Sequence, residues 1–143
     1  MTFLDAYALV ALVADEPAAE EVESLLREGD CRIALANLAE ALDVAQRRHG
    51  LPLEALRTAL DPLLLGPLAA SAPSEADAWR AAELRGRYYD RNDRALSVAD
   101  CFLLAQASAG GDAIATSDPP IAEVAQAEEI DVIGLPDSEG HRP

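Results

Sequence analysis

Short apolar runs alternate with helix-like amphipathic segments along the whole chain. Strands are predicted at residues 2–4, 31–35, 68–70, 113–116 and 132–135. Helices are predicted at residues 6–13, 17–27, 37–48, 52–66, 75–89, 97–108 and 119–127. Because a parallel crossover of this length is normally made by a helix, this alternation predicts an α/β fold. We expect a three-layer α/β/α sandwich with a central parallel sheet.

Two of the predicted helix boundaries depend on single residues. Asn37 is a favoured cap residue, so it is expected to open the helix that His49-Gly50 closes. Pro62 lacks a backbone N–H, so it should kink or end its helix near Leu60.

Length and composition indicate one domain. The chain has 143 residues, half of them apolar, which is enough for a single core. We expect one domain over residues 1–135 and a polar, frayed tail over 136–143. No apolar run approaches the roughly 20 residues that cross a bilayer, and no basic region precedes the first apolar segment, so no membrane association and a cytoplasmic location are expected. Two separate cysteines and two histidines argue against a zinc site.

Four acids are predicted to meet at one edge of the sheet. Asp5 follows the first strand and Asp118 follows the fourth, while Glu40 and Asp100 lie in first turns of predicted helices. In a parallel sheet, chemistry lies in the crevice beyond the carboxyl ends of the strands. Clustered carboxylates repel one another unless a cation lies between them, and an all-oxygen ligand set suits Mg²⁺ or Mn²⁺.

Helix capping is the simpler explanation for each acid taken alone. Asp5 is a good cap for the helix that follows it, and Asn37-x-x-Glu40 and Ser97-x-x-Asp100 both have capping-box spacing. However, Glu40 and Asp100 are embedded in nearly apolar runs, so both are expected to be partly buried. A buried carboxylate needs a partner, and the chain has no lysine to provide one.

The net charge of −15 disfavours an extended nucleic-acid surface, but the cations are concentrated. All basic residues are arginines, and five of them share one segment with Tyr88 and Tyr89, a composition suited to phosphate binding and base stacking: Arg80, Arg85, Arg87, Arg91 and Arg94. A solvated helix face is the alternative. The absence of lysine excludes a P-loop.

Taken together, these motifs resemble the PIN-domain ribonucleases, and among them the VapC-type toxins of bacterial toxin–antitoxin modules. The resemblance rests on Leu4-Asp5 before an apolar helix, an isolated Glu40, Leu96-Ser97-x-x-Asp100 and Thr116-x-Asp118, in family order across nearly the whole chain. The family often has Ser or Thr shortly after the first aspartate. Here Ala6 and Tyr7 follow, so Tyr7 either substitutes for that hydroxyl or packs.

The resemblance implies a Mg²⁺-dependent endoribonuclease that forms a homodimer and is inhibited by an antitoxin protein. Carried over to this chain, it makes Asp5, Glu40, Asp100 and Asp118 the catalytic, metal-binding residues. Asp93 and Asp112 are either replacements for Asp118 or bystanders. We expect Mg²⁺ or Mn²⁺ as cofactor and RNA as substrate. RNA binding is assigned to Arg85, Arg87, Arg91, Arg94 and Thr116.

Two other functions remain open at this stage. A non-catalytic α/β interaction domain would use its acids as caps and the leucine stripe from Leu53 to Leu64 to bind a partner. A metal-dependent phosphatase or receiver-like domain would usually need lysine, or an acid at the position of Tyr7. A nicotinamide-binding fold is disfavoured because no glycine-rich turn follows the first strand.

Overall fold

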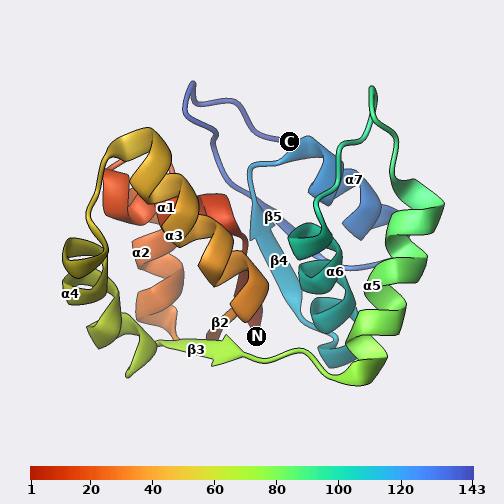
Figure 1. Cartoon of the computed structure of the whole chain (residues 1–143), viewed down its shortest axis with the longest axis horizontal. Helices are drawn as coiled ribbons and strands as arrows, with labels where there is room; N and C mark the ends of the chain where they lie inside the picture. The colour runs from red at the N-terminus through yellow and green to blue at the C-terminus, as the bar shows by residue number, and fades with distance from the viewer.

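A computed structural model describes residues 1–143 and contains one sheet of five parallel strands. The sheet order is β3-β2-β1-β4-β5, which places the first strand at the centre (Figure 1). Each strand pairs in register with its neighbours; Leu4, for example, lies opposite Ile33 and Ala115. The strands are β1 Thr2–Leu4, β2 Cys31–Ala34, β3 Leu68–Ser71, β4 Ala113–Thr116 and β5 Val132–Gly134.

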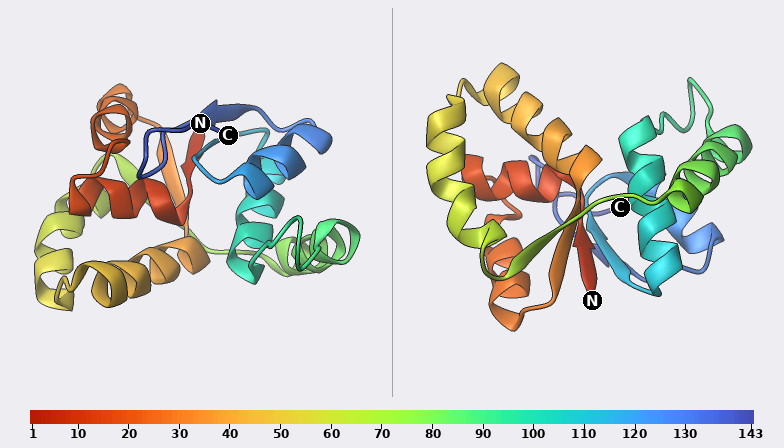
Figure 2. Two further views of the ribbon diagram at one scale, coloured as in Figure 1. Left: turned by 90° about the horizontal axis from the view of Figure 1, so that it is seen from above. Right: turned by 60° about the horizontal axis from the view of Figure 1, so that its bottom comes forward.

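Seven helices cover the two faces of this sheet. They are α1 Ala6–Ala14, α2 Ala19–Glu28, α3 Leu35–His49, α4 Leu53–Leu64, α5 Glu75–Tyr88, α6 Val98–Gly110 and α7 Pro119–Ala127. Figure 2 shows α1 to α4 on one side of the sheet and α5 to α7 on the other. The predicted α/β/α sandwich is therefore confirmed. No helix of the chain is both long enough and apolar enough to cross a membrane.

The core is divided by the sheet into two hydrophobic clusters. Phe3 and Ile114 point toward α5, α6 and α7, whereas Leu4 and Ala115 point toward α1 and α2. This alternation follows from the two-residue period of a strand. Because both faces are covered, β1 is apolar at each position after Thr2, and its first polar side chain toward the carboxyl end is Asp5.

The structure differs from the sequence prediction at two helices. α3 begins at Leu35, directly after β2, so Asn37 lies inside the helix and does not cap it. Of the two effects expected of Pro62, the ending of the helix near Leu60 is wrong, because α4 continues to Leu64 with Pro62 inside it. Pro62 removes a hydrogen bond to the carbonyl of Thr58 four residues earlier, and Thr58 is exposed, so water can satisfy that carbonyl.

The tail also differs from the frayed end that we expected. Residues after Pro136 form no helix or strand, but Arg142 returns to α2 and pairs with Glu21 at 2.6 Å. Arg142 also donates to the carbonyl of Gly134 at the end of β5.

Candidate active site

The four predicted acids line one cleft at the carboxyl edge of the sheet. Its volume is about 370 Å³, and α1, α3, the N-terminus of α6 and the β4–α7 connection form its walls. The lining side chains are Asp5, Ala6, Tyr7, Val10, Glu40, Val44, Arg48, Ala95, Ser97, Asp100, Asp118 and Ile121. Residues that lie far apart in sequence are therefore brought together as predicted.

Asp5 is the most buried of the four, with 2% of its surface exposed. Its Oδ1 accepts a hydrogen bond from the backbone N–H of Ala8 at 2.6 Å, which caps α1. Its Oδ2 accepts from the hydroxyl of Thr116 at 2.5 Å. Burial raises the pKa of Asp5 to about 7, and the carboxylates of Asp118 and Asp100 add to the shift, although the two hydrogen bonds oppose it.

Thr116 connects two of the acids. It is fully buried at the end of β4, and its hydroxyl both donates to Asp5 and accepts from the backbone N–H of Asp118 at 3.0 Å. We expected Thr116 to contact substrate, but the structure places its hydroxyl beneath the cleft, between the two acids. The hydroxyl missing after Asp5 in the sequence is thus supplied by β4, while the Tyr7 hydroxyl donates to Glu16 at 2.6 Å.

Asp100 caps its own helix with one carboxylate oxygen. Its Oδ2 accepts from the backbone N–H of Ser97 at 2.7 Å, and its own N–H donates to the Ser97 hydroxyl at 3.1 Å, which completes a capping box. Capping therefore explains the position of Oδ2 but not that of Oδ1. Oδ1 makes no hydrogen bond within the chain, and burial raises the pKa of Asp100.

Glu40 does not cap a helix. Because α3 starts at Leu35, Glu40 lies in its second turn, and its carboxylate forms no hydrogen bond or ion pair within the chain. The side chain is half-buried. Partial burial, followed by the charges of Asp100 and Asp118, raises the pKa of Glu40. Capping therefore fails to explain this acid.

Asp118 precedes α7 but also makes no side-chain cap. Burial, followed by the charge of Asp100, raises the pKa of Asp118 to about 6. Asp112, the alternative to Asp118, lies at the opposite edge of the sheet. Its Oδ1 is 3.7 Å from the N-terminal amino group. Asp93 lies in the loop before α6 and does not line the cleft.

The acids have no cationic partner in the cleft. Arg48 is the only basic residue that lines it, and it forms no ion pair. An all-oxygen set whose pKa values are raised, first by burial and for Asp5, Glu40 and Asp118 also by neighbouring carboxylates, is chemically suited to a hard divalent cation. No group of three or more His, Cys, Asp or Glu side chains is arranged to hold a metal ion. The four carboxylates therefore line the same cleft, but their oxygens do not converge on a single ion position.

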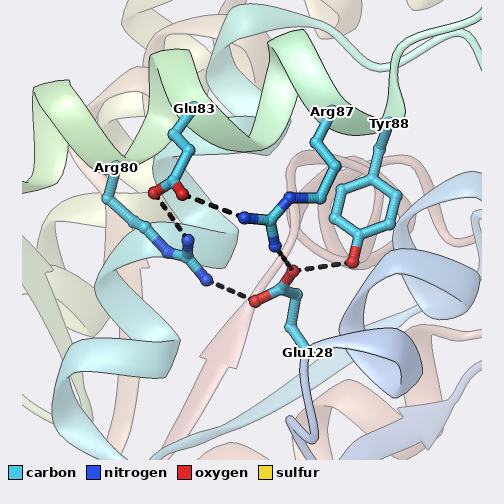
Figure 3. Close-up of polar contacts among 5 residues, drawn as sticks. All are labelled: Arg80, Glu83, Arg87, Tyr88 and Glu128. Carbon is cyan, nitrogen blue, oxygen red and sulfur yellow. Dashed lines mark hydrogen bonds and ion pairs between the residues drawn. The ribbon is translucent and has the colours of Figure 1, made fainter.

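The arginines assigned to RNA lie outside this cleft. Arg87 pairs with Glu83 and with Glu128, both at 2.9 Å, in a network that also includes Arg80 and Tyr88 (Figure 3). Arg94 pairs with Glu123 at 3.2 Å. Arg85 donates to the carbonyl of Leu96 and stacks over the Tyr89 ring at 4.3 Å, while Arg91 is exposed.

Arg48 is the cleft residue that the sequence reasoning missed. It follows Glu40 and Val44 at four-residue steps along α3, so one helix face carries all three to the cleft. That spacing is visible in the sequence, but it becomes informative only once Glu40 is known to face the cleft.

Comparison with known proteins agrees with this geometry. The sequence matches the PIN domain family over residues 2–127. No curated protein sequence matches the chain significantly. Among solved structures, VapC20 of Mycobacterium tuberculosis, described as a sarcin-ricin loop cleaving toxin, has a TM-score of 0.69 and 18% identity over 86% of this chain and 94% of the other.

Two further structures have the same fold at similar identity. FitAcB from Neisseria gonorrhoeae has a TM-score of 0.66 and 22% identity, covering 93% of this chain and 96% of that one. VapBC2 from Rickettsia felis, bound to a promoter DNA fragment, has a TM-score of 0.68 and 16% identity, covering 92% and 96%. With a family match from Thr2 to Ala127 and a parallel sheet that gathers four acids at its carboxyl edge, this chain belongs to the PIN domain family.

Proposed function

We propose that the chain is a Mg²⁺-dependent endoribonuclease and the toxin of a toxin–antitoxin pair. The observation that carries this proposal is the cleft itself, where four elements each contribute a carboxylate and no cation neutralises them. The similarity to a toxin described as cleaving the sarcin-ricin loop supports RNA as the substrate class. Membership of the PIN domain family supports nuclease chemistry.

The four acids would hold the ion, as Mg²⁺ or Mn²⁺, in different ways. Asp5 is fixed by its bonds to Ala8 and Thr116, so it would provide a ligand that needs little reorganisation. Asp100 would offer Oδ1 while Oδ2 keeps α6 capped. Glu40 and Asp118 have no internal bonds to break, so their carboxylates are free to turn toward an ion. A bound divalent ion supplies charge neutralisation and a lowered pKa for a coordinated water.

The reaction would be hydrolysis of a phosphodiester, in which water oxygen bonds to phosphorus and a phosphorus–oxygen bond breaks. Arg48 is placed on the cleft wall, where its guanidinium can attract a phosphate despite the acidic floor. Arg85, Arg87, Arg91 and Arg94 remain our prediction for RNA binding, whereas the buried Thr116 is better explained as a support for Asp5 and Asp118. Since the rest of the surface is acidic, binding should be local and strongly salt-dependent.

An antitoxin partner is supported by the similar structures. The FitAB structure is bound to a DNA fragment, and a Klebsiella pneumoniae structure is described as a toxin–antitoxin complex. We propose that this chain likewise binds an antitoxin protein.

We also propose that the chain forms a homodimer, through the groove between α5 and α6. Its volume is about 560 Å³, and Arg85 is the only charged residue among its lining side chains. In a chain of net charge −15, this is a face where two copies can approach with little repulsion. Val98 and Tyr89, at 55% and 43% exposed, supply apolar surface there.

The nuclease assignment can be tested with charge-removing variants that keep the local hydrogen bonds. In Asp5→Asn and Asp100→Asn, the amide oxygen can still accept the capping bonds, so the fold should persist while metal binding is lost. Wild-type protein should cleave an rRNA fragment in Mg²⁺ and stop in EDTA. Each variant should lose about tenfold to a hundredfold or more of the rate.

Asp43→Asn is the matched control, because Asp43 is an exposed acid of the same helix as Glu40 and pairs with Arg47 at 2.7 Å. It should leave cleavage unchanged. Mg²⁺ or Mn²⁺ should also raise the melting temperature of wild-type protein. Equal cleavage by wild-type protein and both variants, with no thermal shift, would favour the non-catalytic interaction domain instead.

A further inference from the structure

Asn37 is a buried polar side chain that has no hydrogen-bond partner at all. It is 0% exposed, and neither its Nδ2 nor its Oδ1 forms a hydrogen bond. Its neighbours in sequence are Ala36 and Leu38, and an apolar residue would avoid the cost of burying an unpaired amide. Since buried polar groups in proteins are almost always bonded, this one requires an explanation.

The helical period places Asn37 beneath the acid cleft. It precedes Val44 by seven residues and Arg48 by eleven, so it lies within about 20° of both on the surface of α3. Val44 and Arg48 line the cleft, as does Glu40 one turn after Asn37. Asn37 therefore lies on the side of α3 that carries the cleft residues, but it is fully buried and does not itself line the cleft.

Gln106 provides an internal comparison. It is the only other side chain with a buried, unpaired polar atom, in its case Oε1. However, the Nε2 of Gln106 donates to the hydroxyl of Ser71 at 3.0 Å, which connects α6 to β3. Gln106 therefore already has a structural role, whereas Asn37 has none within the chain.

We infer that Asn37 is a positioning residue for the divalent-ion site: its amide gains hydrogen bonds to the carboxylates or ion-bound waters at the cleft floor when the ion binds. This inference rests on the nuclease function proposed above. The Asn37 amide has both groups that this role needs. Its N–H can donate to carboxylate or water oxygens, and its carbonyl can accept from water. Because the amide is neutral, it adds no further charge to the four acids.

The chemistry of the neighbouring acids supports this role. Asp5 already accepts hydrogen bonds from Ala8 and Thr116, and Asp100 accepts one from Ser97. Glu40 and Asp118 receive none through their side chains. A neutral donor below the cleft can therefore orient a carboxylate that the fold leaves unoriented, and loss of such an outer group typically weakens metal binding.

The test compares Mn²⁺ affinity with metal-free stability in Asn37→Leu. Leucine has a similar volume and removes both unpaired atoms, so the metal-free protein should melt at the same or a higher temperature than wild type. Its Mn²⁺ affinity, measured by calorimetry, should nevertheless fall about tenfold to a hundredfold. Asn37→Ser keeps a hydroxyl and should recover part of the lost affinity, and it also serves if the leucine variant does not fold.

Gln106→Leu is the matched control, since it alters a buried amide that does not share the cleft face. It should destabilise the protein by removing the bond to Ser71 but leave Mn²⁺ affinity unchanged. If Asn37→Leu and Asn37→Ser both bind Mn²⁺ as tightly as wild type, the inference fails while the proposed function stands. If wild-type protein binds no Mn²⁺, both fail.

Discussion

Asp5 is held by one local donor and one distant donor. The Ala8 N–H belongs to the helix that Asp5 itself begins, but Thr116 is brought to it by the pairing of β1 with β4. The result is a carboxylate with fixed orientation and little contact with water. Such a group is costly when ionised unless a cation is near, so the acid that we propose as the most rigid metal ligand is also one that opposes folding without metal.

This cost predicts that the metal-free protein loses stability as pH rises from about 4 to about 7. Burial raises the pKa of Asp5 to about 7 and that of Asp118 to about 6, so in this range the folded state retains protons that the unfolded chain has released. Raising the pH therefore favours unfolding, by up to about 4 kcal/mol for Asp5 alone. Urea denaturation in EDTA at pH 5 and pH 8 measures the difference.

Two controls identify the source of this pH effect. Asp5→Asn should reduce the difference between the two pH values, whereas Asp43→Asn, at an exposed acid, should not. Adding Mn²⁺ at pH 8 should restore stability by mass action. Equal stability of the metal-free wild type at both pH values would show that the buried acids do not titrate in this range.

At the scale of elements, the position of a site residue could be predicted when that residue comes directly after a strand. Asp5 and Asp118 were located by the ends of β1 and β4, because apolar runs mark strands clearly and a parallel sheet aligns their carboxyl ends. The start of α3 was missed because Asn37 looked like a cap, yet the chain turns from β2 into the helix at Leu35 with no loop. The propensity of one residue was overridden by the packing of the whole helix.

The use of the arginine segment could not be predicted for a related reason. The sequence shows five arginines in one stretch, but it does not show that Glu128, 41 residues after Arg87, reaches the same helix. Arg80, Arg87 and Tyr88 all bond to this carboxylate, which is only 10% exposed (Figure 3). The network joins α5 to the C-terminal end of α7.

We predict that Glu128→Gln destabilises the protein by about 1–3 kcal/mol, because two guanidinium groups lose the charge that they share. The hydrogen bond from Tyr88, followed by the charges of Arg80 and Arg87, lowers the pKa of Glu128, so its contribution is present at neutral pH and is lost as pH falls through the folded-state value, opposite to Asp5. Urea denaturation at pH 7 measures the loss. Glu123→Gln removes the exposed pair with Arg94 and should cost less than about 0.5 kcal/mol, so similar losses in both variants would contradict a special role for the network.

At the scale of the whole molecule, the order of strands and helices could be predicted almost completely from the sequence. Even the edge strand β3, at Leu68–Ser71, was found from a short apolar run after Gly66-Pro67. The association of the folded chain with other proteins could not be predicted in this way, because a sequence does not show which faces of its helices stay uncovered. Gly86 is an example, because the reason for a glycine at this position depends on whether its face of α5 is covered by another chain.

Gly86 lies in the last turn of α5, where glycine costs about 1 kcal/mol relative to alanine. Apart from its two chain neighbours and the nearby backbone of α5, no atom lies within 4 Å of a Cβ built on Gly86, so no packing inside the protein requires a glycine there. Close approach of a second copy would require one. Gly86→Leu should therefore leave the monomer at least as stable while shifting the homodimer that we propose toward monomer in sedimentation measurements. Ala76→Leu, on the same helix but outside the groove, should leave the dimer intact, and a Gly86→Leu protein that still sediments as a dimer would place the interface elsewhere.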